Sequence, residues 1–177
     1  PFKQRYPEIE VKVFTDWSKD IFGHVFNNDA HVGFASVADI NTVERYLISQ
    51  ENVCVASVED FDMSNLPRYL RIDYQANYLL RSRVDKWWRD NYNRAPSNIL
   101  VIDKLATCIE MIRSGLGYAI VPCGAVKNFP GIKLVPIKDK YDKFIMFDSW
   151  MIYNKDVVGL KIAKIFIDFV KNNKITD

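Results

Sequence analysis

The chain has 177 residues, of which 49% are hydrophobic, so it can bury a core and is not a disordered chain. Its formal net charge of +2 excludes a strong general attraction to nucleic acid or to a membrane surface. No apolar run approaches the roughly 18 residues that cross a bilayer and no signal peptide is visible, so we expect no membrane partner.

The cysteines and histidines predict neither disulfides nor a metal site. Cys54, Cys108 and Cys123 are odd in number, widely separated and embedded in apolar runs, which indicates buried thiols in a reducing, cytoplasmic compartment. His24 and His31 have no acidic or cysteine partners at ligand spacing. We therefore expect no metal and no cofactor.

The first part of the chain predicts a helix end, a strand, a helix and a second strand. Alternation of apolar and charged residues over 9–13 is typical of a half-buried strand. Ser18 is a candidate N-cap for a helix with its apolar face at 21–26, and 31–35 predicts another strand. The short links favour a βαβ unit with parallel strands. Residues 40–58 fit an extended chain as well as a short helix.

A second series of strands and helices begins at residue 70. It contains a strand at 70–74, a helix with Leu80, Val84, Trp87 and Trp88 on one face, and an apolar strand at 99–102. Asp103 is the candidate N-cap of the next helix.

The stretch from Leu105 to Pro122 predicts a helix, a tight turn and a buried strand. Apolar residues at helical spacing lead to Gly115, which suits a left-handed helix end, and Gly117 permits a tight return. The apolar run that follows ends at Pro122. Further strands at 132–135 and 144–153 precede a final helix, with Leu160, Ala163, Ile167 and Val170 on its inner face. This alternation predicts an α/β fold with mostly parallel sheets.

Five motifs in this order resemble the effector-binding, or regulatory, domain of LysR-type bacterial transcriptional regulators. They are FKQRYP at 2–7, NDAHVGFA at 28–35, Glu51 ahead of VCV at 53–55, SGLGYAIVP at 114–122, and FIDFV at 166–170. The second motif lacks the family's usual glycine and aspartate.

The resemblance implies a two-lobed α/β fold of the periplasmic-binding-protein type 2 class. Mixed, mostly parallel sheets would be flanked by helices, and two crossover strands would join the lobes. Residues 1–55 and 149–177 would form lobe I, without the family's first strand, and 56–148 would form lobe II. The family's N-terminal winged helix-turn-helix is not in this chain, which we expect to be part of a longer protein.

The same resemblance implies an effector site in the cleft between the lobes. Its expected residues are Thr15, Asp16, Trp17 and Ser18 in lobe I, and Asp73, Tyr74, Gln75, Asp103, Lys104 and Leu105 in lobe II. Free N–H groups at helix starts favour anions, and Lys104 replaces a frequent serine of the family with a point charge. A carboxylate or phosphate is the expected ligand group.

Each of these residues also has a structural interpretation. Ser18 and Asp103 could be helix caps alone, Lys104 a solvated lysine, and Trp17 plain packing. Of the two tryptophans at 87 and 88, we expect one in the core and one at a surface. The charges of 81–90 are expected to form a solvated helix face, and Cys123 is either a buried inert thiol or a redox sensor.

The leading functional hypothesis is a domain that senses a small anionic metabolite and controls an attached DNA-binding domain. The resemblance implies a homodimer or tetramer, with the helix at 2–6 and the strand at 9–13 of one subunit against the second lobe of the other. One alternative is the solute-binding protein of a transporter. Another is a dehydratase or transferase on the same fold, for which no nucleophile–base pair or carboxylate dyad can be placed, so we expect no enzyme.

Overall fold

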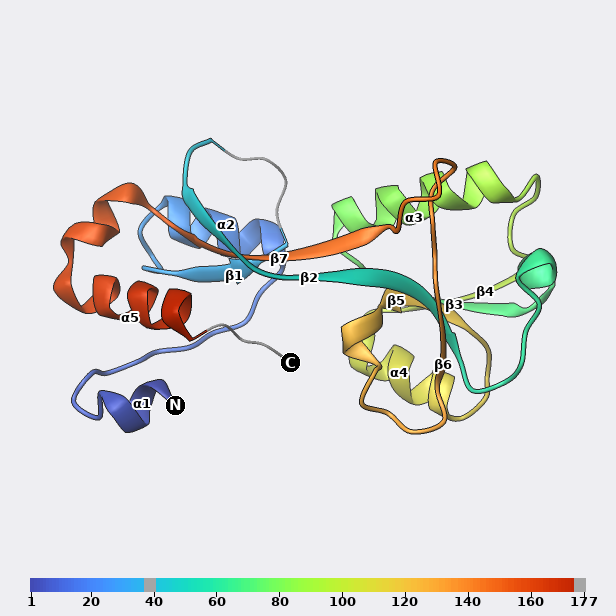
Figure 1. The fold of residues 1–177 in the computed structure, drawn as a ribbon, viewed down its shortest axis with the longest axis horizontal. Coiled ribbons are helices and arrows are strands. Elements are labelled where there is room, and N and C mark those ends of the chain that lie inside the picture. The colour runs from blue at the N-terminus through green and yellow to red at the C-terminus, as the bar shows by residue number, and fades with distance from the viewer. Residues whose placement is uncertain (37–40, 174–177) are drawn as a thin grey trace. The chain divides into compact units, whose positions relative to one another are not determined.

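The computed structural model describes residues 1–36 and 41–173, which form two compact units. Unit 1 comprises Pro1–Gln50 and Asp148–Asp177, and unit 2 comprises Glu51–Phe147. The chain passes between the units in β2 (Glu44–Ser57) and β7 (Met146–Tyr153), which are neighbours in one sheet (Figure 1).

Unit 1 packs helices against a short antiparallel sheet. Its elements are α1 (Phe2–Arg5), α2 (Ser18–Phe26), β1 (Gly33–Ala35), the adjoining parts of β2 and β7, the short helix η3 (Lys155–Gly159) and α5 (Lys161–Asn172). On α5, Ala163, Ile167 and Val170 are buried against Met151 and Tyr153 of β7, because they recur on one helical face. Leu160 stands at the helix N-cap and is half exposed, so it is not part of the buried stripe.

The predicted strand at 9–13 is wrong, and with it the parallel βαβ unit. No strand is found there, and the Val13 side chain is 83% exposed. Alternating residues make a strand only where a neighbouring strand accepts their backbone bonds, and no described strand pairs with this segment. The predicted second strand exists as β1, which pairs antiparallel with β7. The opening helix is held by Phe2, whose ring meets those of Phe166 and Phe169 at 4.9 and 5.1 Å.

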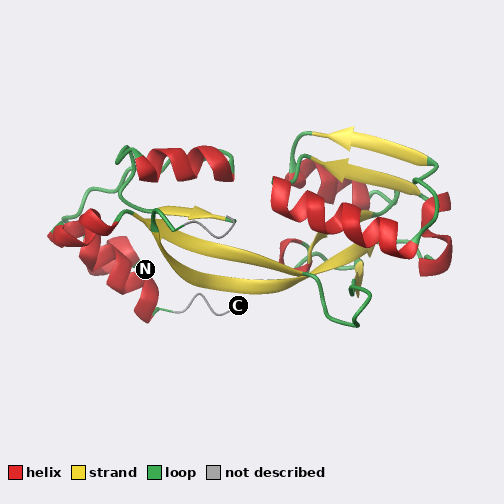
Figure 2. Ribbon diagram, turned by 90° about the horizontal axis from the view of Figure 1, so that it is seen from above, coloured by secondary structure: helices red, strands yellow, loops and turns green. Residues whose placement is uncertain are grey.

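Unit 2 is built on strands with a helix on either side, and of these strands β5 is fully buried. Its elements are η1 (Met63–Arg68), β3 (Leu70–Tyr74), α3 (Tyr78–Asn91), β4 (Asn98–Ile102), α4 (Leu105–Arg113), β5 (Ala119–Pro122), η2 (Cys123–Ala125) and β6 (Lys133–Pro136). Along β2, Val53 and Val55 pack on the α3 side, while Cys54 and Ala56 pack on the α4 side. Figure 2 shows the helices and strands of this unit from above.

The ambiguous stretch after residue 40 is the long strand β2, and residue 40 itself lies outside the described residues. β2 pairs antiparallel with both β5 and β6, whereas β3 and β4 are parallel. The α/β class is confirmed, but the pairings named here are mainly antiparallel. Alternation along the chain predicts parallel pairing only where successive strands pair with each other, and β2 instead meets strands that follow much later.

The predicted helix–turn–strand between 105 and 122 is confirmed. Gly115 has φ +75°, the left-handed conformation that glycine adopts without strain. Gly117 serves a different need, because a Cβ atom there would lie 2.3 Å from the Leu70 carbonyl oxygen. This close approach lets Tyr118 N–H donate to Leu70 at 3.0 Å, and Ile72 N–H donate to Tyr118 at 2.8 Å. The turn thereby joins β5 to β3.

Candidate functional site

The carboxyl ends of β3 and β4 bring two of the expected site segments together. The strands are in parallel register up to Tyr74 and Ile102, and Gln75 N–H donates to the Ile102 carbonyl at 3.1 Å. Residues 73–75 and 103–105 therefore lie at the same edge of unit 2. In open α/β sheets this edge is where ligands usually bind.

The helix that starts at this edge has no side-chain cap. Lys104, and not the predicted Asp103, occupies the N-cap position of α4. The first backbone bond into the helix is donated by Cys108 N–H to Lys104, so the N–H groups of residues 105–107 point beyond the helix start. Lys104 and Asp103 are both exposed. An uncapped helix start beside an exposed ammonium group attracts anions.

Tyr74 lies at the same edge and packs against the apolar residues of both the α3 side and the α4 side. Burial raises the pKa of its phenol, and the negative charge of Glu51 raises it further, so Tyr74 is a neutral hydroxyl at physiological pH. The Glu51 carboxylate in turn accepts a hydrogen bond from Gly124 N–H. Glu51 is therefore a polar group close to Tyr74. In the sequence, only the family motif indicated Glu51.

The expected segment of unit 1 stands at the start of α2. The N-cap is Trp17, whose side chain is 49% exposed, and the predicted cap Ser18 is the first helical residue instead. Asp16 Oδ1 accepts a hydrogen bond from Trp17 N–H at 2.8 Å, while its Oδ2 lies 3.5 Å from His24 Nε2. Thr15 is exposed. This helix start also has no side-chain cap bond, so it resembles that of α4.

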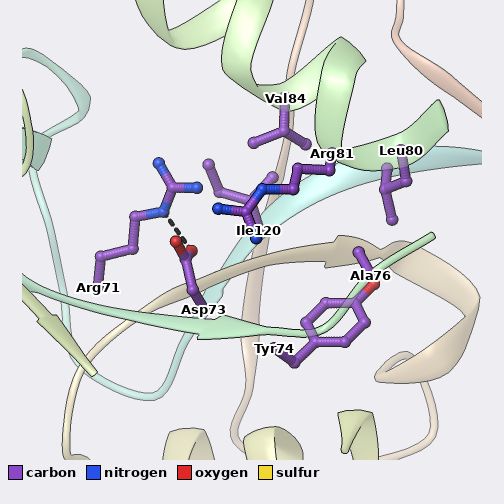
Figure 3. A pocket seen from close by; sticks show the side chains of 8 residues that line it. All are labelled: Arg71, Asp73, Tyr74, Ala76, Leu80, Arg81, Val84 and Ile120. Carbon is purple, nitrogen blue, oxygen red and sulfur yellow. Dashed lines mark hydrogen bonds and ion pairs between the residues drawn. The ribbon is translucent and has the colours of Figure 1, made fainter. Parts of the chain in front are cut away.

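A small pocket lies beneath α3 within unit 2 (Figure 3). It holds about 330 Å³ of empty space, part of it open solvent, and is lined by Arg71, Asp73, Tyr74, Ala76, Leu80, Arg81, Val84 and Ile120. Arg71 is 7% exposed, and its Nε donates to Asp73 Oδ1 at 2.6 Å. Asp73 therefore has a cation partner on the α3 side of β3, which the sequence did not reveal.

The tryptophan pair differs from the expectation of one core and one surface residue. Both are buried, Trp87 at 4% and Trp88 at 7% exposure. Trp88 is held by its Nε1, which donates to the Arg94 carbonyl at 2.9 Å, and by the Arg71 guanidinium over its ring. The charged face of α3 carries exposed ion pairs at i, i+4 spacing, as predicted.

The three cysteines are free thiols, and Cys54 and Cys108 are buried. A hydrogen bond between Cys54 and Cys123 raises the pKa of Cys54, with burial as a further cause, and lowers that of half-buried Cys123. Burial raises the pKa of Cys108 to about 12. Within 1–36 and 41–173, no group of three or more histidine, cysteine or acidic side chains could hold a metal ion, and no helix could span a membrane.

Comparison with known proteins identifies relatives over nearly the whole chain. A family model described as the LysR substrate binding domain matches residues 1–174. The uncharacterized HTH-type transcriptional regulators YraN and YkuM of Bacillus subtilis are 26% identical over 174 residues and 22% identical over 179. These alignments cover 98% and 97% of this chain but 60% and 59% of the relatives, so the chain spans about three-fifths of their length.

Solved structures share the fold at low sequence identity. The effector-binding domain of QuiR in complex with shikimate has a TM-score of 0.76 at 14% identity, covering 98% of this chain and 86% of that one. The Synechocystis PCC6803 CcmR regulatory domain in complex with 2-PG has a TM-score of 0.76 at 15% identity, with coverages of 99% and 88%. The BenM effector-binding domain with benzoate has a TM-score of 0.66 at 14% identity, covering 95% of this chain and 83% of that one. The two-lobed fold class predicted from the sequence is confirmed, and the chain belongs to the LysR substrate-binding domain family.

Proposed function

We propose that this chain is the ligand-sensing regulatory domain of a LysR-type transcriptional regulator, and that it binds a small organic anion. The observation that carries the anion proposal is the start of α4. There, free N–H groups of an uncapped helix and the exposed Lys104 adjoin the carboxyl ends of β3 and β4.

The chemistry of this edge suits a carboxylate or phosphate group. An anion at a helix start gains typically about 0.3–1 kcal/mol from the helix dipole, and a lysine ammonium adds a mobile point charge. Gln75 and Tyr74 supply neutral hydrogen-bonding groups for the rest of the ligand. Shikimate and benzoate, which the QuiR and BenM domains bind, are both carboxylates.

The predicted two-lobed arrangement remains part of this proposal. Unit 1 would act as lobe I, predicted at 1–55 and 149–177, and unit 2 as lobe II, predicted at 56–148. The uncapped α2 start at Thr15–Ser18 would then supply the second wall of the effector site. The coupling free energy between an effector site and a second binding site is typically about 1–3 kcal/mol, which is sufficient to alter the affinity for DNA.

The partners follow from the family. We propose a cytoplasmic homodimer or tetramer that contacts DNA through a domain outside this chain. It would use no cofactor and have no membrane partner. The family supports a regulator over a transporter's solute-binding protein, and over a dehydratase or transferase.

Calorimetric titration of the chain against carboxylic acids, phosphate esters, amines and neutral apolar compounds tests the proposal. We expect saturable binding of at least one anion, weakened about threefold to tenfold by Lys104→Gln because one charge contact is lost. Lys161→Gln removes an exposed lysine at the start of α5 and should leave the affinity unchanged. Binding only of cationic or apolar compounds would contradict the anion site, and turnover of any compound would contradict the absence of an enzymatic function.

A further inference from the structure

Two of the three cysteines lie on the same face of the unit 2 sheet. In the antiparallel register of β2 and β5, Cys54 is opposite Val121 and Val53 is opposite Pro122. Cys123 follows Pro122 directly, so it is the diagonal neighbour of Cys54. Both cysteines pack in the apolar cluster on the α4 side of the sheet. Two thiols that are far apart in the chain therefore meet in one place.

The turn that carries Cys123 is fastened to β2 close to Cys54. Cys123 is the first residue of η2, so the chain leaves the extended path of β5 at this point. The next residue, Gly124, donates its N–H to the carboxylate of Glu51 in β2. A Cβ atom at position 124 would collide with that carboxylate, so glycine permits the close approach. The position of Cys123 is thus fixed by its own neighbours.

A hydrogen bond joins the two thiols and gives them different chemical properties. It raises the pKa of Cys54, with burial as a further cause, and it lowers the pKa of Cys123. The negative charge of Glu51 opposes ionisation of both thiols. Because Cys54 is fully buried and Cys123 is partly exposed, the sulfur that ionises is that of Cys123. The thiolate is the nucleophilic form of cysteine, so Cys123 is the attacking sulfur of the pair.

The third cysteine lies in the same cluster but lacks these properties. Cys108 belongs to α4 and is fully buried. Burial raises its pKa to about 12, so it stays a neutral thiol at physiological pH. Cys108 is therefore a matched control for the other two cysteines.

We propose that Cys54 and Cys123 form a reactive dithiol, which exchanges with small-molecule disulfides and closes into an intramolecular disulfide. In the first step, the Cys123 thiolate attacks one sulfur of the small disulfide, a mixed disulfide forms on Cys123, and one small thiolate leaves. In the second step, the sulfur of Cys54 attacks that of Cys123 and gives up its proton, the mixed disulfide breaks, and a second small thiol leaves. The protein loses two electrons and two protons, and the small disulfide is reduced to two thiols.

This modification site is distinct from the proposed anion site. Neither cysteine belongs to the residues at the carboxyl ends of β3 and β4, so the dithiol does not depend on anion binding there. The disulfide would link β2 covalently to the turn after β5. Each of the two proposals can fail without the other.

Reaction of the reduced, native chain with glutathione disulfide tests the proposal. The mixture is quenched with acid and analysed by intact mass spectrometry and peptide mapping. We expect the chain to lose two hydrogen atoms, with the new bond between Cys54 and Cys123, and to regain them when reduced glutathione is in excess. A chain that stays reduced, keeps an unresolved glutathione adduct, or pairs either residue with Cys108 would overturn the proposal.

Single substitutions separate the roles of the two sulfurs. Cys54→Ala should stop the reaction at a stable glutathione adduct on Cys123. Cys123→Ala should react at least about tenfold more slowly, because both remaining thiols are buried. The control Cys108→Ala should change the rate less than about twofold, because its thiol takes no part in the exchange.

Circular dichroism establishes which variants keep the native fold. The mapping of the disulfide in the unsubstituted chain needs no variant, so a variant that failed to fold would leave that test intact. Equal rates for folded Cys123→Ala and the unsubstituted chain would overturn the proposal. So would a folded Cys108→Ala variant that no longer forms the disulfide.

Discussion

Replacing Gly117 by alanine tests how tightly the glycine turn holds unit 2 together. The added Cβ would lie 2.3 Å from the Leu70 carbonyl oxygen, and Cβ atoms in real proteins essentially never approach another atom closer than 3.0 Å. The obstacle is a backbone atom, so Tyr118 and the strand β5 that follows it have to move away from β3. That shift breaks the two bonds joining Tyr118 to Leu70 and Ile72, whose lengths are 3.0 and 2.8 Å.

The expected loss of stability is about 2–5 kcal/mol. Each broken bond leaves a buried N–H or C=O group unpaired, at about 1–3 kcal/mol apiece, while partial relaxation limits the total. Urea unfolding followed by circular dichroism gives the free energy of unfolding. Amide hydrogen exchange at Ile72 and Tyr118 shows whether the damage is local.

The matched control is Gly23→Ala. Gly23 lies inside α2, and a Cβ atom added there would meet nothing within 4 Å, so alanine should stabilise the helix by about 0.5–1 kcal/mol. If Gly117→Ala changed stability by less than about 1 kcal/mol and left both amides protected, the account of this turn would be refuted.

Three further outcomes are expected. Arg71→Met should lower the free energy of unfolding by about 1–3 kcal/mol, measured by urea unfolding, because it leaves the partly buried Asp73 carboxylate without its partner; an unchanged value would contradict a stabilising pair. In the native protein, a thiol-specific reagent should modify Cys123 rapidly and the other two cysteines only after unfolding, so uniform labelling of all three would be the contrary result. Hydrogen bonds from Ser64 lower the pKa of Asp62 in the folded protein. The ionised carboxylate of Asp62 therefore contributes its full stabilisation at pH values above the ordinary aspartate pKa of about 3.9. This stabilisation is lost as the pH falls through the lower pKa of the folded state. Asp62→Asn should therefore flatten the dependence of melting temperature on pH below about 4, and an unaltered profile would exclude this role.

Local patterns in the sequence predicted the elements of unit 2 well. The strand at 70–74, the helix after it and the helix–turn–strand ending at Pro122 are each specified by residues close together in the chain. The start of α4 was misplaced by one residue, because capping preference favours Asp103 although the backbone begins the helix after Lys104.

Features that depend on distant partners could not be predicted. Residues 9–13 have the alternation of a strand, but whether a strand forms is decided by a neighbour that the pattern does not contain. The direction of β2 pairing depends in the same way on strands that follow much later in the chain.

The pocket beneath α3 could not be predicted from the sequence either. Its signal is an arginine and an aspartate two residues apart in an apolar strand, Arg71 and Asp73. A half-exposed strand with charged residues on its solvent face would have the same sequence pattern. The bridge between Arg71 and Tyr118 shows that these two residues share one face of the sheet, and both are buried there.

The central claim, that an anion binds where β3 and β4 end beside α4, is tested most directly by backbone amide chemical shifts. An ¹⁵N-labelled sample is titrated with the tightest-binding acid from the calorimetric panel. We predict that the largest saturable shifts within unit 2 occur at residues 73–75 and 103–107, and that these shifts are smaller in Lys104→Gln. If these amide signals stayed unchanged while the acid caused saturable shifts elsewhere in the protein, an anion site at this edge would be contradicted.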